Sequence, residues 1–596
     1  MPKKASNKEV AKRSQGAPAP PPPAPPTYQP VSPAKAIFYA VAFLVLAAIS
    51  SPVSQYNLSP VYGTLPSYIF HHRGTLYAAL LGFMLKHYLY PYLPRYLHNV
   101  LPIVAYWIPV IQFYLFSFSS TFGPVWGPLI TEICTYYPLL WLSTFSAKVM
   151  LDAVDLEGVN PTMAEMGPAL ASYMTFSFME KAASALLPRF IGSSEFITRS
   201  GLQLIVATSY TVLCPSRWIL LAIPAMLHSS RLNIHNPSNS TTALLNQQLE
   251  QQEGWRLLER RESITGYVSV LESLESGFRV MRCDHSLLGG EWLVTDERIK
   301  MGQVEPEPVY GVFELLGGIR LVELDKPIPE TEKNALMIGL GIGTAPKSLI
   351  GAGIPTTIVE IDPAVHAFAT SYFGLPTNHT VHLANAISFA ANNSVSHPGS
   401  YDYIVHDVFT GGAEPVGLFT HEFFNDLKGM LKEETGVVAI NYAGDTRLPS
   451  TQLVLNTIHS VFPACRIFRD NPPPTPADGS GAPTPAEALP HDFVNMVVFC
   501  TRSAAALKDG RMQFRRPTDA EVGKSIARRQ NMWPKPELEI PYVRPEGLEA
   551  GGAWKGDERV VTRARTDKLS EGHRESVISH WKIMRTVVPA KVWEMW

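Results

Sequence analysis

Three glycines at alternate positions follow a short apolar run in the stretch ALMIGLGIGTAPKSLI, residues 335–350. Gly339 and Gly341 would let the backbone turn sharply and approach a ligand without a Cβ in the way, and Gly343 would let the next helix pack on a sheet. A turn of this kind holds a nucleotide-like ligand when it joins a strand to a helix. The spacing alone is a weak signal, because many glycine turns are merely tight turns.

Three polar residues further along the chain strengthen the signal. Glu360 closes the next strand about 20 residues downstream, where a carboxylate can accept hydrogen bonds from both hydroxyls of a ribose. Asn385 follows a third predicted strand, and its amide is either an adenine contact or a plain loop residue. Asp407 ends a fourth predicted strand and opens into a glycine-containing loop. Ligands bind outside the carboxyl ends of parallel strands, so we expect these residues to share one crevice with the glycine turn.

The alternation of strand-like and helix-like runs predicts the elements that position these residues. It is typical of an α/β domain with a Rossmann-like, seven-stranded sheet, here expected over residues 331–503 with a Pro/Gly/Ala-rich insert at 471–489. Short β-rich runs, GYVSVLES, FRVMRCD and IRLVELD, predict a small antiparallel β domain over 261–330. A polar connector, 229–260, precedes it.

The first part of the chain has a different composition. Only 17% of the 596 residues are charged, and most of the long uncharged runs lie in the first 230 positions. The run AIFYAVAFLVLAAISSPV is near the length that crosses a bilayer as a helix. We expect an all-α transmembrane domain over 35–228 with about six spans, near 36–53, 74–91, 100–121, 125–147, 165–187 and 202–227. Residues 1–34, basic and Pro-rich, are expected to be disordered.

Flanking charges and cysteines predict the location. The Lys/Arg-rich amino terminus is expected in the cytosol, and six spans would place the catalytic domain there too, in a multi-pass integral membrane protein. Five or seven spans would reverse this inference. The five cysteines lie far apart without CxxC pairs, so neither a disulfide framework nor a metal site is indicated. The net charge of −2 provides no general field for binding nucleic acid.

The tail, 504–596, leaves two alternatives open. Its last part carries Trp581, Trp593 and Trp596 in a sequence that could form an amphipathic helix. Tryptophan favours the membrane interface, so this helix could lie on a membrane surface. Packing of the tryptophans onto the Rossmann-like domain is the other interpretation.

The order of the GxGxG turn, VEID and YDYIVHDVFTGG resembles the spermidine/spermine synthase family, the polyamine aminopropyltransferases, over about 264–503. The resemblance implies a Rossmann-like class I methyltransferase fold behind a small β domain, and decarboxylated S-adenosylmethionine as donor of an aminopropyl group to putrescine or spermidine. It also implies that the three glycines and Glu360 bind the cofactor and that Asp407 helps to deprotonate the attacking amine, whereas Asn385 stands where the family usually has an aspartate. Dimers are common in that family.

Departures from the family pattern keep other functions open. The acidic position of the family's glycine turn is Ile342 here, and the second aspartate after the catalytic one is Thr410. Two positive charges on a diamine are costly to bury without partner carboxylates. The main expectation is therefore a membrane-anchored spermidine-synthase-like transferase, with an S-adenosylmethionine-dependent methyltransferase as the alternative. A non-catalytic nucleoside-binding membrane protein is the second alternative.

Overall fold

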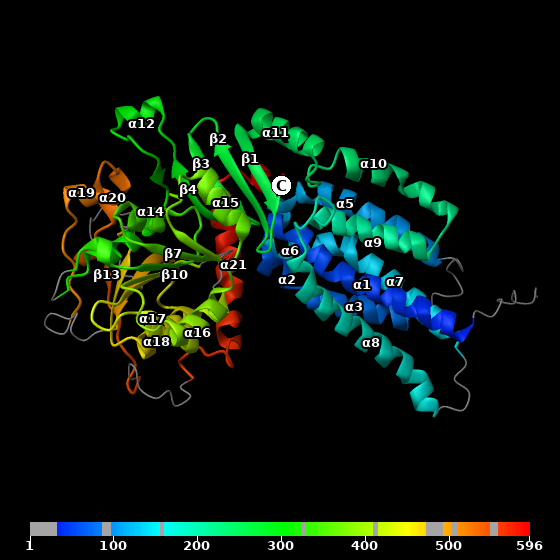
Figure 1. Cartoon of the computed structure of the whole chain (residues 1–596). Helices are drawn as coiled ribbons and strands as arrows, with labels where there is room; N and C mark the ends of the chain where they lie inside the picture. Colours follow the sequence, from blue (N-terminus) through cyan, green and yellow to red (C-terminus); the bar gives the residue numbers. More distant parts are fainter. Residues whose placement is uncertain are drawn as a thin grey trace, which may run out of the picture.

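The computed structural model describes residues 32–85, 97–154, 160–324, 328–408, 415–472, 493–502, 511–548 and 558–596. Three parts follow one another along the chain: a group of helices, a small antiparallel sheet, and a larger sheet covered by helices (Figure 1). The small sheet lies between the other two parts. The amino-terminal segment up to residue 31 and nearly all of the expected insert at 471–489 fall outside the described residues.

The amino-terminal part consists of helices packed side by side (Figure 1). Apolar side chains of α1, α5, α7, α9 and α10 form its core. The helices are α1 Pro33–Tyr62, α2 Thr64–Tyr68, α3 His71–Met84, η1 Leu97–Val100, α5 Leu101–Phe116, α6 Ser119–Cys134, α7 Tyr136–Leu151, α8 Pro161–Leu186, η2 Leu187–Arg189, α9 Arg199–Leu213, η3 Arg217–Ala222, α10 Ile223–Arg231 and α11 Asn239–Glu253.

These helices differ from the six expected spans in number and length. The fourth expected span is divided at Thr135, where α6 ends and α7 begins, and the sixth is divided between α9 and η3 at the Cys214–Pro215 step. Proline removes a helix donor and clashes with the preceding turn, which explains the second break. Among the described residues, two segments are long and apolar enough to cross a membrane, Pro33–Tyr62 and Leu97–Phe116.

The small sheet is antiparallel, with its five strands in sequence order. The strands are β1 Trp255–Glu262, β2 Tyr267–Ser273, β3 Phe278–Cys283, β4 Ser286–Trp292 and β5 Glu307–Pro308, followed by the short helices α12 Asp296–Lys300 and α13 Val312–Leu316. β1 lies in the segment expected to be a connector. The run IRLVELD, expected to be a strand, begins instead in the 3₁₀ helix η4 Gly317–Leu321. Its apolar side chains are buried there, and a short apolar run does not by itself distinguish a strand from a buried helical turn.

The larger sheet has the strand order β13-β11-β12-β10-β9-β6-β7-β8. Strands β8, β7, β6, β9 and β10 are parallel, and β12 pairs antiparallel with both β10 and β11. This order, with the reversed strand beside the fifth, is the class I methyltransferase arrangement of the Rossmann-like fold, as expected. The strands are β6 Ala335–Ile338, β7 Thr356–Glu360, β8 Thr380–Leu383, β9 Tyr403–His406, β10 Val437–Gly444, β11 Ala464–Arg469, β12 Val494–Thr501 and β13 Glu539–Ile540.

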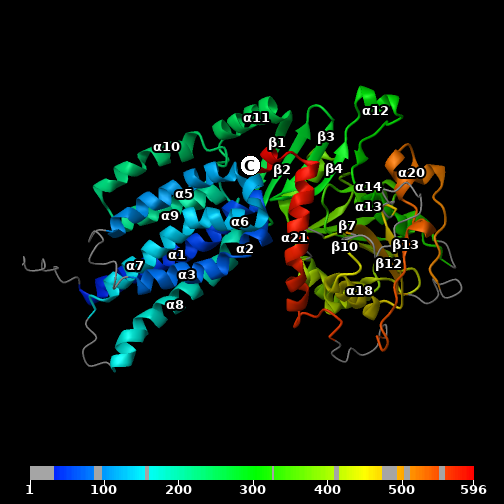
Figure 2. The same cartoon turned by 180° about the vertical axis from the view of Figure 1, so that it is seen from behind.

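The eighth strand, β13, comes from the tail, which explains why seven strands were expected. Helices cover both faces of the sheet (Figure 2). They are α14 Thr344–Gly351, α15 Pro363–Tyr372, α16 Ala386–Ser396, η6 Val416–Phe419, α17 His421–Met430 and α18 Pro449–Val461, with η5 Glu330–Glu332, α19 Asp519–Val522, α20 Ile526–Asn531 and η9 Pro536–Leu538 at the periphery. Every residue of β10 is buried, as a central strand covered on both faces requires.

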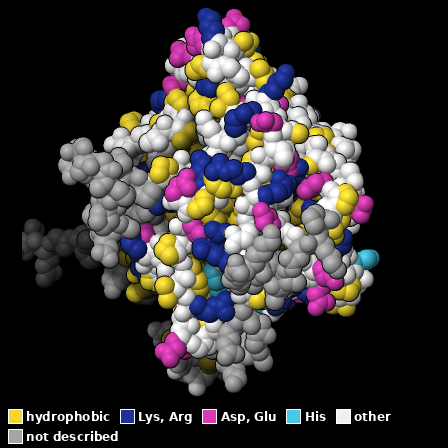
Figure 3. Space-filling view, turned by 90° about the vertical axis from the view of Figure 1, so that its left-hand side faces the viewer, with side chains coloured by type: hydrophobic (Ala, Val, Ile, Leu, Met, Phe, Trp, Pro, Cys, Tyr) yellow, Lys and Arg dark blue, Asp and Glu magenta, His cyan; other side chains and the backbone are white. Residues whose placement is uncertain are grey.

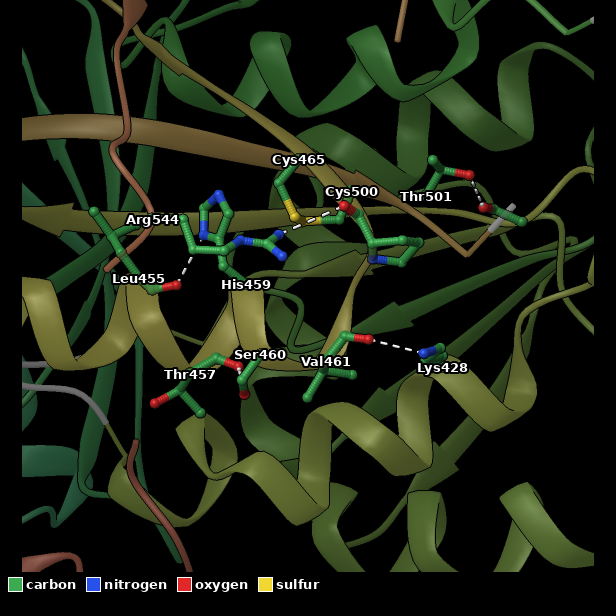
Figure 4. Close-up of a disulfide and its surroundings, with 12 residues drawn as sticks. Lys428, Leu455, Thr457, His459, Ser460, Val461, Cys465, Cys500, Thr501 and Arg544 are labelled. Atoms are coloured by element: carbon green, nitrogen blue, oxygen red, sulfur yellow. Dashed lines mark hydrogen bonds between the residues drawn. A yellow bond between two sulfur atoms is a disulfide. The ribbon is translucent and has the colours of Figure 1, made fainter. Parts of the chain in front are cut away.

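A disulfide joins Cys465 of β11 to Cys500 of β12 (Figure 4). The two residues face each other in the antiparallel register of these strands. The cysteine spacing did not indicate this disulfide, because a separation of 35 residues carries no pairing signal until the strands are placed side by side.

The tail forms α21 Asp567–Val587 and α22 Ala590–Glu594. α21 stands between the helical part and the larger sheet (Figure 2). The indole of Trp581 donates to the carbonyl oxygen of Val61 at the end of α1 (3.1 Å), and Trp596 stacks on His235 with 4.7 Å between ring centroids. Trp593 is fully buried. The tryptophans therefore pack at the junction of the helical part and the small sheet, which neither interpretation of the tail anticipated.

On the face of the larger sheet's helices that points away from the helical part, Lys and Arg side chains are interspersed with Asp and Glu (Figure 3). Charges of both signs are thus mixed on this face, in keeping with the near-zero net charge.

One buried arginine, Arg282 of β3, joins the helical part, the small sheet and the tail, and its replacement tests this junction. Replacing Arg282 with methionine would leave four buried carbonyl oxygens without this donor, at about 1–3 kcal/mol for each unsatisfied group. We expect the melting temperature of the detergent-solubilised full chain to fall by roughly 5–10 °C. Arg256→Met, an exposed arginine of β1 in the same sheet, is the matched control and should melt like the wild type. Equal melting temperatures for the two variants would contradict a structural role for Arg282.

Candidate active site

A cavity of about 800 Å³ lies at the carboxyl ends of the parallel strands. All three parts of the protein and the tail line it. The larger sheet contributes the glycine turn, Glu360, Asn385, Asp407 and Asn441; the helical part contributes Gly63, Thr64 and Leu65; the small sheet contributes Cys283 to Leu288; and α21 contributes His580, Ile583 and Met584. Its volume is in the range of pockets that enclose a ligand of nucleoside size together with a second reactant.

The glycine turn follows β6 directly and forms one wall. Gly339 and Gly341 have φ values of 81° and 55°, in the left-handed region, and both line the cavity. A Cβ on Gly339 would lie 2.0 Å from the carbonyl oxygen of Asp407, and one on Gly341 would lie 2.5 Å from that of Leu288. Gly343 is placed differently: it precedes α14 and packs against Leu375 outside the cavity lining.

Glu360 lies at the end of β7, where the sequence predicted it. It is only 8% exposed, and its Oε1 accepts a hydrogen bond from the backbone of Asp362 (2.8 Å). Burial raises the pKa of Glu360 to about 7. The cap of the following helix is Asp362. Glu360 is therefore a carboxylate that faces the cavity and does not itself cap α15.

Asp407 follows β9 and lies beside the glycine turn. Its Oδ1 accepts a hydrogen bond from Nδ2 of Asn441 on the neighbouring strand β10, at 2.8 Å. Burial raises the pKa of Asp407 to about 6, while the Asn441 bond favours the charged form. At neutral pH this carboxyl group is ionised and can accept a proton.

Asn385 lies in the cavity lining as expected, and it is also the N-cap residue of α16. Its Oδ1 accepts from the backbone of Ile387 and caps α16. Ile342 is 2% exposed and packs against Gly289 of β4. The family's acidic position is thus part of the hydrophobic core here. Thr410 lies outside the described residues.

Several cavity residues were not anticipated from the sequence. Asn441 lies within an apolar strand, and His285 lies in a tight turn between β3 and β4. His580 comes from a segment after the expected catalytic domain. The polar Asn441 in an otherwise apolar run was the only one of these with a recognisable sequence signal.

The residues present fit a sulfonium nucleoside. The two glycines bring the backbone of the turn to the cavity in a left-handed conformation that a side chain would disturb, and a buried carboxylate ends the second strand of the unit, where ribose hydroxyls are bound in this fold. The cavity extends well beyond these groups toward the small sheet and α21.

Comparison with curated proteins gives a match along nearly the whole chain. The N-terminal histidine N-methyltransferase of Emericella nidulans is 43% identical over 566 residues, which cover 94% of this chain and 98% of that protein. The polyamine aminopropyltransferase of Vibrio vulnificus is 33% identical over 143 residues, covering 23% of this chain and 46% of that one. No family model matches the chain.

Solved structures resemble only part of the chain. A probable spermidine synthase from Corynebacterium glutamicum has a TM-score of 0.31 at 17% identity, covering 41% of this chain and 78% of that one. Human methyltransferase-like protein 13 in complex with SAH has a TM-score of 0.24 at 22% identity, covering 40% and 94%. Scores this low carry no argument about function.

The expected membership of the spermidine/spermine synthase family, and with it aminopropyl transfer to putrescine or spermidine, was therefore wrong. The aminopropyltransferase match is confined to about a quarter of the chain, whereas the methyltransferase match runs through all three parts. The physical reason is that the glycine turn and the ribose carboxylate serve any S-adenosyl cofactor. The polyamine-specific acidic position is a buried isoleucine here.

Gly339→Ala tests the role of the turn. The added Cβ would displace the backbone of Asp407 and strain the left-handed turn, so we expect S-adenosylhomocysteine affinity to fall by more than about tenfold in calorimetry. Gly374→Ala is the matched control, because Gly374 also has a positive φ (65°) but a Cβ there meets no atom within 4 Å. A similar affinity for both variants would contradict a role of the glycine turn in binding the cofactor.

The match over nearly the full length of both proteins, together with a class I fold and a cavity at its strand ends, gives the enzyme class. The co-substrate is S-adenosylmethionine. The chain belongs to the methyltransferase family represented by the N-terminal histidine N-methyltransferase of Emericella nidulans.

Proposed function

We propose that this protein transfers a methyl group from S-adenosylmethionine to a nitrogen of a histidine at the amino terminus of a protein. The observation that carries the proposal is the 43% identity to the N-terminal histidine N-methyltransferase along 94% of this chain. The identity includes the helical part and the tail, which supply the cavity walls away from the glycine turn.

The larger sheet supplies the cofactor side of the proposed site. Gly339 and Gly341 would lie against the nucleoside, Glu360 would accept hydrogen bonds from the ribose hydroxyls, and Asn385 would contact the base. S-adenosylmethionine supplies an electrophilic methyl group, whose bond to sulfur breaks as the bond to nitrogen forms. The protein's part in such an in-line displacement is mostly positioning.

Asp407 is the residue proposed to act on the acceptor. A nitrogen can attack only with a free lone pair, and a neighbouring N–H must release or share its proton. A carboxylate with a pKa of about 6 is ionised at neutral pH and can accept that hydrogen. Asn441 holds the carboxyl group in place through its 2.8 Å hydrogen bond.

We also propose that the helical part is embedded in a membrane. Its helices expose large apolar side chains on the outside while their interior contains a polar cluster, the reverse of a water-soluble bundle. In the interior, Glu132 accepts hydrogen bonds from Ser54, Gln55 and Tyr137 and pairs with His71 at 2.7 Å. The exposed apolar residues include Tyr77, Leu80, Leu170, Phe178, Val212 and Leu220.

The direction of α1 predicts on which side of the membrane the catalytic part lies. Its 30 residues rise about 45 Å, and its last turn contacts the small sheet through Pro60. If α1 crosses the membrane, the basic amino terminus and the catalytic part lie on opposite sides. A cytosolic amino terminus would then place the catalytic part in a non-cytosolic compartment, where a disulfide such as Cys465–Cys500 is stable.

Protease protection tests this orientation. The protein is given an amino-terminal tag and prepared in sealed microsomes. We expect added protease to remove the tag but leave the catalytic part intact until detergent is added. Digestion of the catalytic part in intact microsomes would restore the cytosolic location expected from six spans. A maleimide shift that requires prior reduction would report the disulfide in the same samples.

The proposed activity is tested with the purified full chain and a peptide that begins with histidine. Mass spectrometry should find one added methyl group on that residue, and none when the peptide begins with alanine. Failure to methylate the histidine peptide under conditions in which S-adenosylhomocysteine binds would refute the proposed acceptor.

Asp407→Asn tests the acceptor role of the carboxylate. We expect turnover to fall by about 10²–10⁴-fold, while S-adenosylhomocysteine affinity stays within about tenfold of the wild type. Asp426→Asn, a carboxylate on α17 that is absent from the cavity lining, should keep full activity. An active Asp407→Asn enzyme would rule out the proposed role of this carboxylate.

A further inference from the structure

The cavity has a second side that the cofactor residues do not account for. Besides the glycine turn, Asp407 and Asn441, its lining includes the turn between β3 and β4, residues 63–65 and α21. Several of these side chains are apolar, among them Leu287, Ile583 and Met584. A polar group among them that lacks a partner therefore marks a place where a ligand would complete a hydrogen bond.

His285 is such a group. It lies in the turn between β3 and β4, it is 2% exposed, and it belongs to the cavity lining. Its ring stacks on Trp581 with 5.4 Å between centroids and lies 4.3 Å from the ring of Trp593. The two tryptophans hold the imidazole in one orientation.

The hydrogen bonds of His285 define which nitrogen carries the proton. Nε of Arg585 donates to Nε2 of His285 at 3.3 Å, so Nε2 is an acceptor. Burial and the positive charges of Arg585 and Arg282 keep the pKa of His285 well below its usual range, so the ring is neutral. The proton is then on Nδ1. This buried N–H has no hydrogen-bond partner among the described residues.

A buried donor without an acceptor costs about 1–3 kcal/mol, which a ligand oxygen would recover. The ligand group must accept a hydrogen bond, and the residue at the end of a protein offers a carbonyl oxygen close to its side chain and amino group. Asp407, by contrast, suits an N–H of the same residue. The lining of the cavity thus contains a hydrogen-bond acceptor, Asp407, and an unpartnered donor, His285.

We propose that His285 positions the acceptor: its Nδ1–H donates a hydrogen bond to the carbonyl oxygen of the terminal histidine while Asp407 receives that residue's N–H. This inference rests on the proposed function and adds a residue that distinguishes a peptide end from a free amine. His285 is a positioning residue, since the methyl group is transferred at the nitrogen near Asp407.

His285→Phe removes the donor and keeps a flat ring for the two tryptophans. With a histidine-initiated peptide, we expect KM to rise about tenfold and kcat to change less than about threefold, because one buried hydrogen bond is lost. The probe for the carbonyl is histamine, which has the imidazole and the amine but no carbonyl group. The wild type should prefer the peptide to histamine, and His285→Phe should lose about tenfold of that preference.

His285→Asn is the conservative variant, because its amide can present an N–H near the position of Nδ1. It should restore most of the peptide KM. S-adenosylhomocysteine affinity and melting temperature are measured for His285→Phe and His285→Asn, and we expect both quantities to match those of the wild type.

An unchanged preference for the peptide over histamine in His285→Phe would overturn the inference, even if the wild type methylates the peptide. The inference would also be overturned if His285→Asn were as stable as the wild type but kept the raised KM for the peptide. A wild-type enzyme that binds S-adenosylhomocysteine but methylates no histidine peptide would instead refute the proposed function.

Discussion

The guanidinium of Arg282 holds the helical part, the small sheet and the tail of the protein together. It is 1% exposed and donates to the carbonyl oxygens of Pro60 at the end of α1, Asp284 in the β3–β4 turn, and Val592 and Trp593 in the tail. Burial lowers its pKa to about 10, so it remains charged at neutral pH. A buried charge is tolerated only when its hydrogen bonds are satisfied. The positions of α1, the small sheet and the tail are therefore mutually dependent.

This dependence extends to the catalytic cavity. The turn fixed by Arg282 continues into His285, and the same tail that reaches Arg282 places α21 against the cavity. A second buried group acts nearby, since Arg199 of α9 pairs with Glu262 and Asp284 of the small sheet. The cavity lining outside the larger sheet is thus contributed by the helical part, the small sheet and the tail together. The residues proposed to bind the cofactor all belong to the larger sheet.

This division explains why the sequence predicted the cofactor correctly and the reaction incorrectly. The glycine turn and Glu360 lie within one strand-turn-helix-strand unit and are shared by enzymes that use S-adenosyl compounds. The residues proposed to contact the acceptor, Asp407 and His285, come from segments far apart in the chain. A single changed position, Ile342, already argued against a diamine, because its side chain belongs to the core and offers no charge to an ammonium group.

The sequence by itself determined the class I fold, the strand ends that carry Glu360 and Asp407, and an apolar amino-terminal part, because each depends on patterns within a few tens of residues. Only the tertiary structure decided the partners of groups far apart in the chain. Cys465 meets Cys500 across a strand pair, and Arg282 meets Trp593 across 311 residues. The contacts of the tail tryptophans and of His285 are likewise with segments that are distant in the sequence. Hydrogen bonds and packing between distant segments leave no periodic signal in the sequence, so their chemistry becomes visible only when the chain has folded.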